Sequence, residues 1–253
     1  GAANTAQIAR YLVVTGETRI GGSGPGWIAV DGNNAAGSGY IAGGTNTLEK
    51  VGANAVVIRA GIAVTVGVIN VRSGNLSMET SSTLNNDYAL NVYTGGLFYG
   101  FNWTQTLGRA VGFAGGTLQA LSGTLNATGT FTAQSSGILF AQGVMNHTGV
   151  IAGAGVLLVN ANGTTSIVHL AGSNANTAAG ELTLFNGTTR FDKPAGVNAW
   201  AGSAIVLREP RPRRARAAGG GSTRTMLRYV VSEWRFSLLY MVGTSLLVTV
   251  LNA

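Results

Sequence analysis

The residues of this 253-residue chain that could act as acids or bases are few and scattered. Carbohydrate-cleaving sites on repetitive β-folds place two or three carboxylates close together on neighbouring repeats. The middle of this chain repeats with a period of 21 residues. One period after Glu79 stands Gly100, and one period after Asp87 stands Gly108, so no stacked acid pair is predicted. Pairs of carboxylates that lie on different faces of a repeat are not excluded by this comparison. We expect solvated turn carboxylates and no enzyme activity; the acidic residues of positions 1–207 are Glu17, Asp31, Glu49, Glu79, Asp87, Glu181 and Asp192.

Histidine and cysteine chemistry is equally sparse. The chain has no Cys, which excludes a disulfide framework, a Cys-ligated zinc site and a thiol nucleophile. Neither His147 nor His169 lies in a nucleophile–base motif. His147 takes a repeat position held elsewhere by Ala127, which indicates a tolerant surface position, and His169 is interpreted as a satisfied strand residue. No cofactor and no metal ion are predicted.

Two further motifs have simple interpretations. The run Gly21–Gly26 begins like a calcium-binding nonapeptide repeat, but Gly26 stands where the ligating Asp would be, and no Lys follows to make a phosphate loop. We therefore expect a flexible turn there. Six Asn-x-Ser/Thr sequons would carry glycans only in a host that glycosylates, and we expect ladders of Asn side chains at turns instead. The sequons start at Asn75, Asn102, Asn126, Asn146, Asn162 and Asn186.

The composition indicates which elements must position these side chains. Glycine contributes 39 residues and proline only 4, while hydrophobic residues make up 45% and charged residues 10%. This hydrophobic content excludes a disordered chain, and glycine without a three-residue period excludes collagen. A chain rich in Gly, Ala, Asn, Thr and Val suits short strands and tight turns better than helices.

A repeat runs through the middle of the chain. The pattern Gly, any residue, Leu, any residue, apolar starts at Gly74, Gly95, Gly116 and Gly137, at a constant spacing of 21, with looser copies at 155 and 180. A second phase matches residues 123–129 to 143–149 at a spacing of 20. Three short strands and three turns fill a period of this length, which is one rung of a parallel β-solenoid. A β-sandwich or other all-β fold is the alternative.

The repeat predicts a continuous interior. Because residues one period apart lie above each other, Leu76, Leu97, Leu118 and Leu139 are predicted to form one buried ladder. The repeat glycines are predicted to mark corners that need positive φ. We expect an all-β fold, a parallel β-solenoid of eight to ten rungs. Residues 52–207 are predicted to form the solenoid, and residues 1–51 an N-terminal cap or irregular early rungs.

This pattern resembles two groups of known proteins. Gly/Asn/Thr/Ala-rich solenoids with short rungs of this period are similar to the passenger domains of bacterial autotransporters and to filamentous-haemagglutinin-like adhesins. They are also similar in architecture to virion tailspike proteins. The resemblance covers about residues 52–207 and implies a surface-displayed, often non-catalytic rod. No functional residue is carried over from it.

The charge lies in the C-terminal tail. Residues 1–207 hold eight Lys/Arg and seven Asp/Glu, whereas residues 208–253 hold eight Arg and two Glu. We divide this tail into an Arg-rich, Gly-rich linker (208–222) and an apolar attachment segment (223–253). The near-neutral body is not expected to attract nucleic acid, so a nucleic-acid contact is open only through the Arg-rich tail. A protease site in the Arg run and a plain basic linker are further alternatives.

Three interpretations of the apolar segment stay open: a short membrane anchor or interfacial helix through residues 230–253, a segment packed on partner subunits, and a terminal strand that caps the solenoid. The apolar run from Phe236 to Leu251 would span about 24 Å as a helix, less than the roughly 30 Å hydrocarbon core of a bilayer. The predicted attachment residues are Arg211, Arg213, Arg214, Arg216, Trp234, Arg235, Phe236, Leu238, Leu239, Leu246 and Leu247.

The functional expectation follows from this division. The displayed solenoid and its attached tail predict a non-enzymatic structural or adhesive component of a cell surface, virion or filament, associated with a membrane or a large assembly. Its expected partners are protein neighbours in that assembly, and glycans are a further candidate. An accessory scaffold subunit of a membrane complex is the first alternative, and a carbohydrate-active β-helix enzyme is the second.

Overall fold

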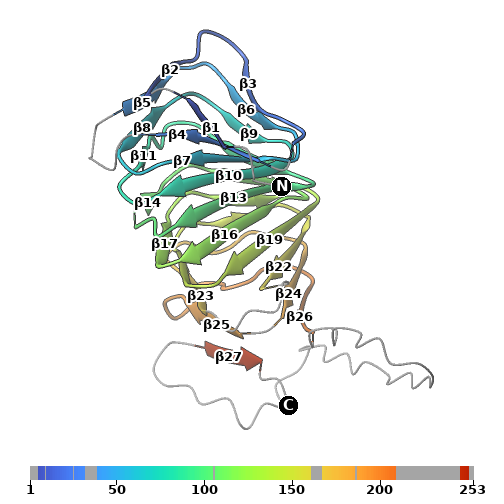
Figure 1. Ribbon diagram of the computed structural model, residues 1–253. Coiled ribbons are helices and arrows are strands. Elements are labelled where there is room, and N and C mark those ends of the chain that lie inside the picture. The colour runs from blue at the N-terminus through green and yellow to red at the C-terminus, as the bar shows by residue number, and fades with distance from the viewer. Residues whose placement is uncertain are drawn as a thin grey trace, which may run out of the picture.

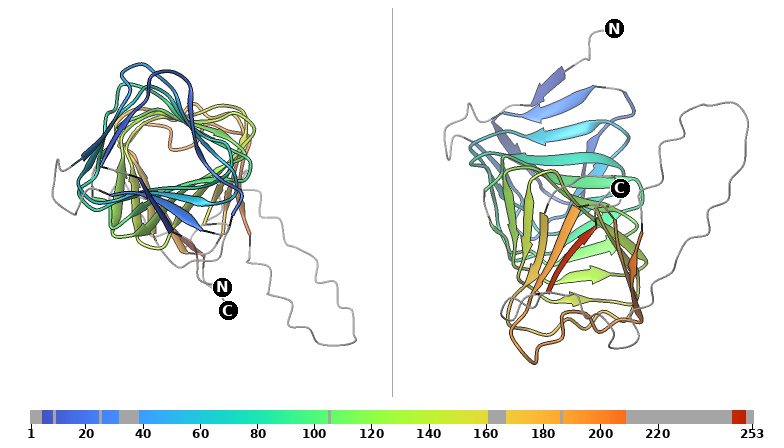
Figure 2. Two further views of the ribbon diagram at one scale, coloured as in Figure 1. Left: turned by 45° about the horizontal axis from the view of Figure 1, so that its top comes forward. Right: turned by 90° about the horizontal axis from the view of Figure 1, so that it is seen from below.

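The computed structural model describes residues 5–8, 10–24, 26–31, 39–104, 106–160, 167–185, 187–208 and 246–250. These residues form strands and turns without a helix, and the strands stack as a parallel β-solenoid (Figure 1). In a view nearer to the solenoid axis, successive turns of the chain follow the same outline, and the sheets form its sides (Figure 2). The predicted fold class is therefore confirmed.

The strands form four sheets. Sheet A contains β1 (Thr5–Ile8), β4 (Trp27–Val30), β7 (Ala55–Ile58), β10 (Gly74–Glu79), β13 (Gly96–Phe101), β16 (Thr117–Ser122), β19 (Ser136–Ala141), β22 (Val156–Val159), β24 (Glu181–Leu184) and β26 (Ala204–Leu207). Sheet B contains β2 (Tyr11–Val13), β5 (Gly39–Ala42), β8 (Ile62–Thr65) and β11 (Thr83–Leu84). Sheet C contains β3 (Thr18–Gly21), β6 (Leu48–Val51), β9 (Ile69–Val71), β12 (Leu90–Tyr93), β15 (Val111–Ala114), β18 (Phe131–Ala133) and β21 (Ile151–Ala152). Sheet D contains β14 (Thr106–Leu107), β17 (Thr124–Ala127), β20 (Val144–His147), β23 (Ile167–Ala171), β25 (Gly187–Asp192) and β27 (Leu246–Val250).

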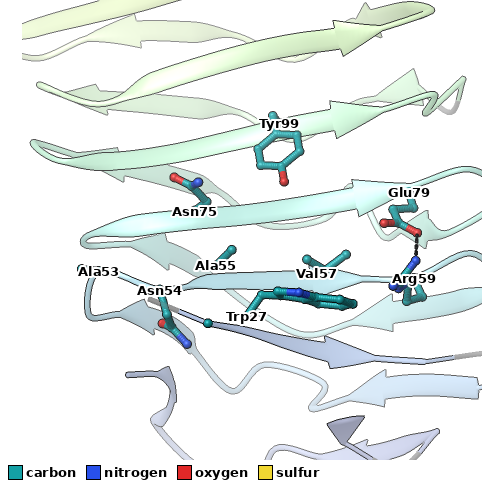
Figure 3. A pocket seen from close by; sticks show the side chains of 10 residues that line it. Trp27, Ala53, Asn54, Ala55, Val57, Arg59, Asn75, Glu79 and Tyr99 are labelled. Carbon is teal, nitrogen blue, oxygen red and sulfur yellow. Dashed lines mark ion pairs between the residues drawn. The ribbon is translucent and has the colours of Figure 1, made fainter. Parts of the chain in front are cut away.

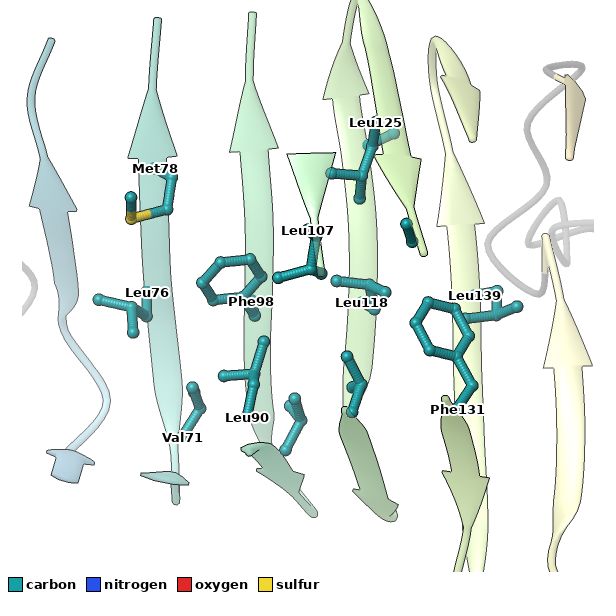
Figure 4. Packing of buried hydrophobic residues seen from close by; sticks show 14 of the residues in the cluster. Val71, Leu76, Met78, Leu90, Phe98, Leu107, Leu118, Leu125, Phe131 and Leu139 are labelled. Atoms are coloured by element: carbon teal, nitrogen blue, oxygen red, sulfur yellow. The ribbon is translucent and has the colours of Figure 1, made fainter. Parts of the chain in front are cut away.

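One buried column of sheet A shows why this sequence folds as a solenoid. In-register pairing of successive strands stacks inward side chains that are at most 1% exposed, and Figure 4 shows part of the column. Each rung alone cannot bury its apolar face, so the rungs stabilise one another by stacking. The column consists of Val56, Leu76, Phe98, Leu118, Leu139, Val159 and Leu184.

The predicted leucine ladder is correct at three of its four positions. Leu97 pairs with Asn75 and lies half-buried on the outer face, whereas Phe98 occupies the interior position between Leu76 and Leu118. The step from Leu76 to Phe98 is longer than the step from Phe98 to Leu118. These two rungs therefore differ in length although the repeat glycines are evenly spaced.

The extra residue lies at one corner. Val71 and Val92 are in register in sheet C, but Gly74 pairs with Gly96, so the connection from β12 to β13 is one residue longer than that from β9 to β10. Gly95, at this corner, has φ of +81° and no atom near the position of a Cβ.

The repeat glycines serve two different purposes. Gly74 and Gly95 have positive φ, as predicted, but Gly116 and Gly137 do not. At Gly116 a Cβ would collide with a methyl carbon of Val92 on the preceding rung. The prediction of positive φ is therefore wrong at these two corners, where close approach of the neighbouring rung requires glycine instead.

One side of the solenoid changes from sheet B to sheet D along the stack. In each rung this side follows the strand of sheet A: β11, after β10, belongs to sheet B, and β14, after β13, belongs to sheet D. Trp103, just before β14, is 1% exposed, and its Nε1 donates to the carbonyl of Ser82 at 2.8 Å. A Cβ at Gly100 would lie 3.2 Å from the Trp103 side chain. Trp103 therefore fills the room that the small residue of β13 leaves.

Two buried cations hold carbonyl groups at the corners. The Lys50 ammonium, fully buried, donates to the carbonyls of Val51, Gly52 and Ser73 at 2.8 to 2.9 Å. Burial lowers the pKa of Lys50 to about 8. The ammonium thereby satisfies one carbonyl at the end of β6 and two, of Gly52 and Ser73, that lie outside the strands.

Arg109 performs the same task across three rungs. Its buried guanidinium donates to the carbonyls of Val66, Gly67, Asn85 and Ala89 at 2.6 to 3.3 Å. Burial lowers the pKa of Arg109 to about 10. A side chain with several fixed donors is suited to joining carbonyl groups from successive rungs.

The tail contributes one strand to the described structure. β27 pairs antiparallel with β25, with Leu246 opposite Phe191 and Leu247 opposite Arg190. Leu246 and Leu247 therefore belong to a strand that adds to the last rung of sheet D. Among the residues described, no helix is long and apolar enough to cross a membrane.

Candidate functional site

A shallow groove lies on the outer face of sheet A, across β4, β7, β10 and β13 (Figure 3). Its volume of about 420 Å³ falls within the range of small-molecule sites. The lining residues are Gly26, Trp27, Ala53, Asn54, Ala55, Val57, Arg59, Asn75, Glu79 and Tyr99. Strand pairing places them, because alternate residues of each strand face outward and the register aligns them across rungs.

Two aromatic rings bound the groove. Trp27 projects from β4, and Tyr99 projects from β13 with its hydroxyl directed towards β10 (Figure 3). Three inter-strand steps separate these strands, about 14 Å. The small side chains of Ala55 and Val57 form a low floor next to Trp27. The groove therefore offers two aromatic surfaces with open space between them.

A column of alternating charge closes one end of the groove. Val30, Ile58 and Met78 are in register, so the residues that follow them, Asp31, Arg59 and Glu79, follow one another up the face.

Arg59 holds this charged end together. Its Nη1 lies 3.5 Å from Oε2 of Glu79, and its guanidinium carbon lies 4.7 Å from the centre of the Trp27 ring. Burial raises the pKa of Glu79, with Asp31 adding to the effect and Arg59 opposing it. The carboxyl of Glu79 is consequently easier to protonate than an exposed one.

Uncharged polar groups lie along the rest of the groove. Asn75 faces outward from β10, and Asn54 accepts a hydrogen bond from the backbone N–H of Gly22 at 2.7 Å. Ser77 lies between Val57 and Tyr99 in register, and its buried Oγ has no hydrogen-bond partner among the described residues. The Nε of Arg59 is likewise buried without a partner in this part of the chain. These two atoms lie beneath the surface of sheet A, so the accessible polar groups of the groove are the amides of Asn54 and Asn75.

The acidic residues differ from the prediction of solvated turns. Glu79 lies in a strand with a side chain 19% exposed, and Glu49 lies in β6 with a side chain 7% exposed. Burial opposes ionisation of Glu49, but hydrogen bonds from Arg72 and Asn70 hold its pKa below the usual value. The sequence missed these positions because each acid is paired with a residue one rung away.

His147 also departs from its predicted place. It is 1% exposed, stacks on Phe131 with ring centres 3.9 Å apart, and lies 3.0 Å from the carbonyl of Gly129. Burial lowers its pKa to about 4, so the ring is neutral at pH 7. The surface interpretation was wrong because its partner Ala127 is itself an interior residue.

His169 is a satisfied strand residue, as predicted. It lies in β23, and its Nδ1 is 3.2 Å from Oδ2 of Asp192. Arg190 Nε donates to the other oxygen of the same carboxylate at 2.7 Å. The three side chains form a small polar cluster on sheet D.

Among the described sequons one Asn–Asn pair is hydrogen-bonded, and it lies in strands, not at the turns where ladders were predicted. Asn146 donates to Asn126 at 3.0 Å between β20 and β17. At a corner, Asn102 accepts from the Ser122 hydroxyl at 2.7 Å. Asn75 lines the groove, and Asn162 and Asn186 lie outside the described residues.

Most of the predicted attachment residues also lie outside the described residues. Leu246 and Leu247 belong to β27. Nothing is described of Arg211, Arg213, Arg214, Arg216, Trp234, Arg235, Phe236, Leu238 and Leu239. Their role in attachment stays a prediction.

The fold defines this chain as a parallel β-solenoid protein. Comparison with family models, curated proteins and solved structures gave no significant match. In the described part of the chain, no group of three or more His, Cys, Asp or Glu residues is arranged to hold a metal ion.

Sequence reasoning did not find the groove. Trp27 and Tyr99 are far apart in the sequence, and only the register across three steps of sheet A brings them to one face. One signal was present: Asp31, Arg59 and Glu79 each lie at the end of a strand-like segment. The irregular spacing of the early rungs concealed their alignment.

Proposed function

We propose that this chain is a non-enzymatic structural or adhesive surface component, in which the solenoid is displayed and the C-terminal tail attaches it to a membrane or a large assembly. The observation that carries the adhesive role is the groove on sheet A. It is open, bounded by Trp27 and Tyr99, and lined by the uncharged amides of Asn54 and Asn75. Rigid strands position these side chains, which favours recognition of a ligand without rearrangement.

The tail supports attachment through its composition. Eight Arg against two Glu in residues 208–253 suit an anionic surface, either lipid head groups or an acidic protein neighbour. The pairing of β27 with β25 gives the end of the tail a second task, covering an edge strand of the solenoid. In this proposal attachment depends on residues 208–245, and the last strand finishes the fold.

The attachment experiment replaces Arg211, Arg213, Arg214 and Arg216 together by Gln in the full chain. We expect binding to vesicles containing anionic lipid, or to the chains that co-purify with it, to weaken and to lose its salt dependence. Replacing Arg10 and Arg19, exposed cations of the body that lie outside the groove, serves as the control. Equal binding of the tail variant and the unchanged chain would contradict tail-mediated attachment.

The adhesive experiment places the full chain on a glycan array. Retention on defined glycans is expected for an adhesin, whereas an accessory scaffold subunit would co-purify with partner chains and bind no glycan. The two functions predict opposite results on the array, so the array separates them.

One observation favours a second candidate, a carbohydrate-active enzyme. Glu79 and Asp31 lie on the same face two rungs apart, and burial raises the pKa of Glu79, as a general acid requires. Arg59 lies between them in register and pairs with Glu79, which favours a structural role for that carboxylate. Release of reducing ends from a polysaccharide, abolished by Glu79→Gln, would establish the enzyme and overturn the proposed function.

A further inference from the structure

We propose that the groove on sheet A binds uncharged pyranose units of a glycan chain, held between Trp27 and Tyr99 across β4 to β13. This inference rests on the proposed adhesive role and names its ligand class. Four features of the groove carry it: the aromatic walls, their separation, the balance of charge, and the uncharged amides that line it.

The aromatic walls suit sugar rings. One face of a pyranose presents only C–H groups, which pack on the π-face of an aromatic side chain, while its hydroxyls point sideways. Trp27 is already held on one side by the Arg59 guanidinium, 4.7 Å from the ring centre. A side chain fixed in this way loses little conformational entropy when a ligand packs on it.

The separation of the walls favours a chain over a single sugar. The two aromatic side chains come from strands that are about 14 Å apart. An oligosaccharide that lies across the strands can contact both side chains. The floor beside Trp27 is made of Ala55 and Val57, which are small enough to let a sugar ring approach the sheet.

The charges select against acidic sugars. Two carboxylates, Asp31 and Glu79, lie at the end of the groove with a single guanidinium. Arg59 is occupied by Glu79 and by the Trp27 ring, so its charge is not available to a uronate or a sulfated sugar. A glycan carboxylate would therefore face net repulsion, whereas hydroxyl groups would not.

The polar groups supply directional hydrogen bonds. Asn75 and Asn54 line the groove and present uncharged amides, each with a carbonyl that accepts and an amino group that donates. Sugar hydroxyls both donate and accept, so they match a mixed set of this kind. Uncharged partners also avoid the large desolvation cost of an unpaired charge.

The test is isothermal titration calorimetry of the full chain with neutral hexasaccharides from cellulose, amylose, mannan and N-acetylated chitin, and with oligogalacturonate as the acidic probe. We expect at least one neutral oligosaccharide to bind, and oligogalacturonate to bind more weakly. Trp27→Ala and Tyr99→Ala should each weaken binding about tenfold, the loss of one stacking contact. Trp27→Phe should retain most of the affinity because an aromatic face remains.

Tyr40→Ala is the matched control. Tyr40 is an exposed aromatic residue on sheet B that contacts Tyr11, with ring centres 4.9 Å apart, and does not line the groove. This variant should bind like the unchanged chain. Thermal unfolding of all variants confirms that lost binding is not lost folding.

The outcomes separate this inference from the proposed function. Tighter binding of oligogalacturonate, or neutral binding that Trp27→Ala and Tyr99→Ala leave unchanged, overturns the groove assignment and leaves an adhesin. Cleavage of a bound oligosaccharide overturns the non-enzymatic function and leaves the groove. Absence of binding by every probe at millimolar concentration overturns the inference, while the attachment experiment still decides the structural role.

Discussion

Two stretches of the solenoid share one interior and differ in their outer faces. The stretch from β4 to β13 carries the groove, with Asp31, Arg59 and Glu79 at its end. Residues 110–180 contain no Asp, Glu, Lys or Arg at all. The outer column of sheet A that contains Trp27 and Asn75 continues in this stretch as Thr117, Ile138 and Leu158. The interior column continues through both stretches, so the inward residues specify the fold and the outward ones are free to carry chemistry.

The two stretches also satisfy their corners differently. In the groove stretch and at its end, the buried cations Lys50 and Arg109 donate to corner carbonyls. In the uncharged stretch neutral Asn160 and Asn176 satisfy backbone donors instead, accepting from the N–H groups of Ala141 and Ile151. Uncharged corners need no buried charge, which removes a desolvation cost.

The largest loss of stability is expected when a side chain of the shared interior is shortened. Leu76→Ala in the groove stretch and Leu118→Ala in the uncharged stretch should each lower the free energy of unfolding by about 2–5 kcal/mol, because both side chains are fully buried. Leu97→Ala, on the outer face of the same sheet, should cost less than about 1 kcal/mol. Denaturant unfolding followed by circular dichroism measures all three. An equal loss for Leu97→Ala would mean that our register is wrong.

The next effect distinguishes the uncharged stretch by its pH response. Burial lowers the pKa of His147 to about 4 from 6.5, so below pH 6.5 the unfolded chain takes up a proton before the folded chain does. Stability should therefore fall as the pH drops from about 6.5 to about 4, by about 3 kcal/mol in total. His147→Ala should remove this slope relative to the unchanged chain. Unfolding midpoints measured across that pH range test it, and parallel curves for both proteins would disprove it.

A smaller effect sharpens the contrast between charged and uncharged ladders. Asn70 donates to the Glu49 carboxylate at 3.2 Å and accepts from Asn91 at 3.0 Å, whereas Asn146 donates only to the neutral Asn126. Asn70→Ala should cost about 1.5–3 kcal/mol and Asn146→Ala about 0.5–1.5 kcal/mol, since bonds to charged groups are stronger. Denaturation midpoints compare them. The reverse order would show that the Glu49 carboxylate gains nothing from Asn70.

The smallest effect concerns Glu79 in the groove. Because burial raises its pKa above 4.5, its contribution to stability is full below pH 4.5 and is lost as the pH rises through the raised pKa. Glu79→Gln should remove this shallow decline, although it also breaks the ion pair with Arg59. Thermal unfolding between about pH 4 and pH 7 records the difference. A steeper decline in the variant would show that the ion pair outweighs burial.

The fold class, the approximate rung length and the second repeat phase were all predictable from the sequence. β17 and β20 pair in the register that the second repeat phase predicted, with Leu125 opposite Met145 and Ala127 opposite His147. These features were predictable because a solenoid repeats its inward residues at nearly constant spacing, and that spacing is visible in one dimension. Leu76, Leu118 and Leu139 were placed correctly for the same reason.

The rungs whose lengths differ from that spacing became visible only in the strand register of the folded chain. One additional residue between Val92 and Gly96 moved Leu97 outward and Phe98 inward, because a shift of one residue in a strand exchanges its two faces. The rung step from Ile28 to Val56 is likewise much longer than the step from Val56 to Leu76, which hid the alignment of the groove residues on β4, β7 and β10. The groove therefore exists only in the register between rungs, which turns of unequal length set and which no fixed period contains.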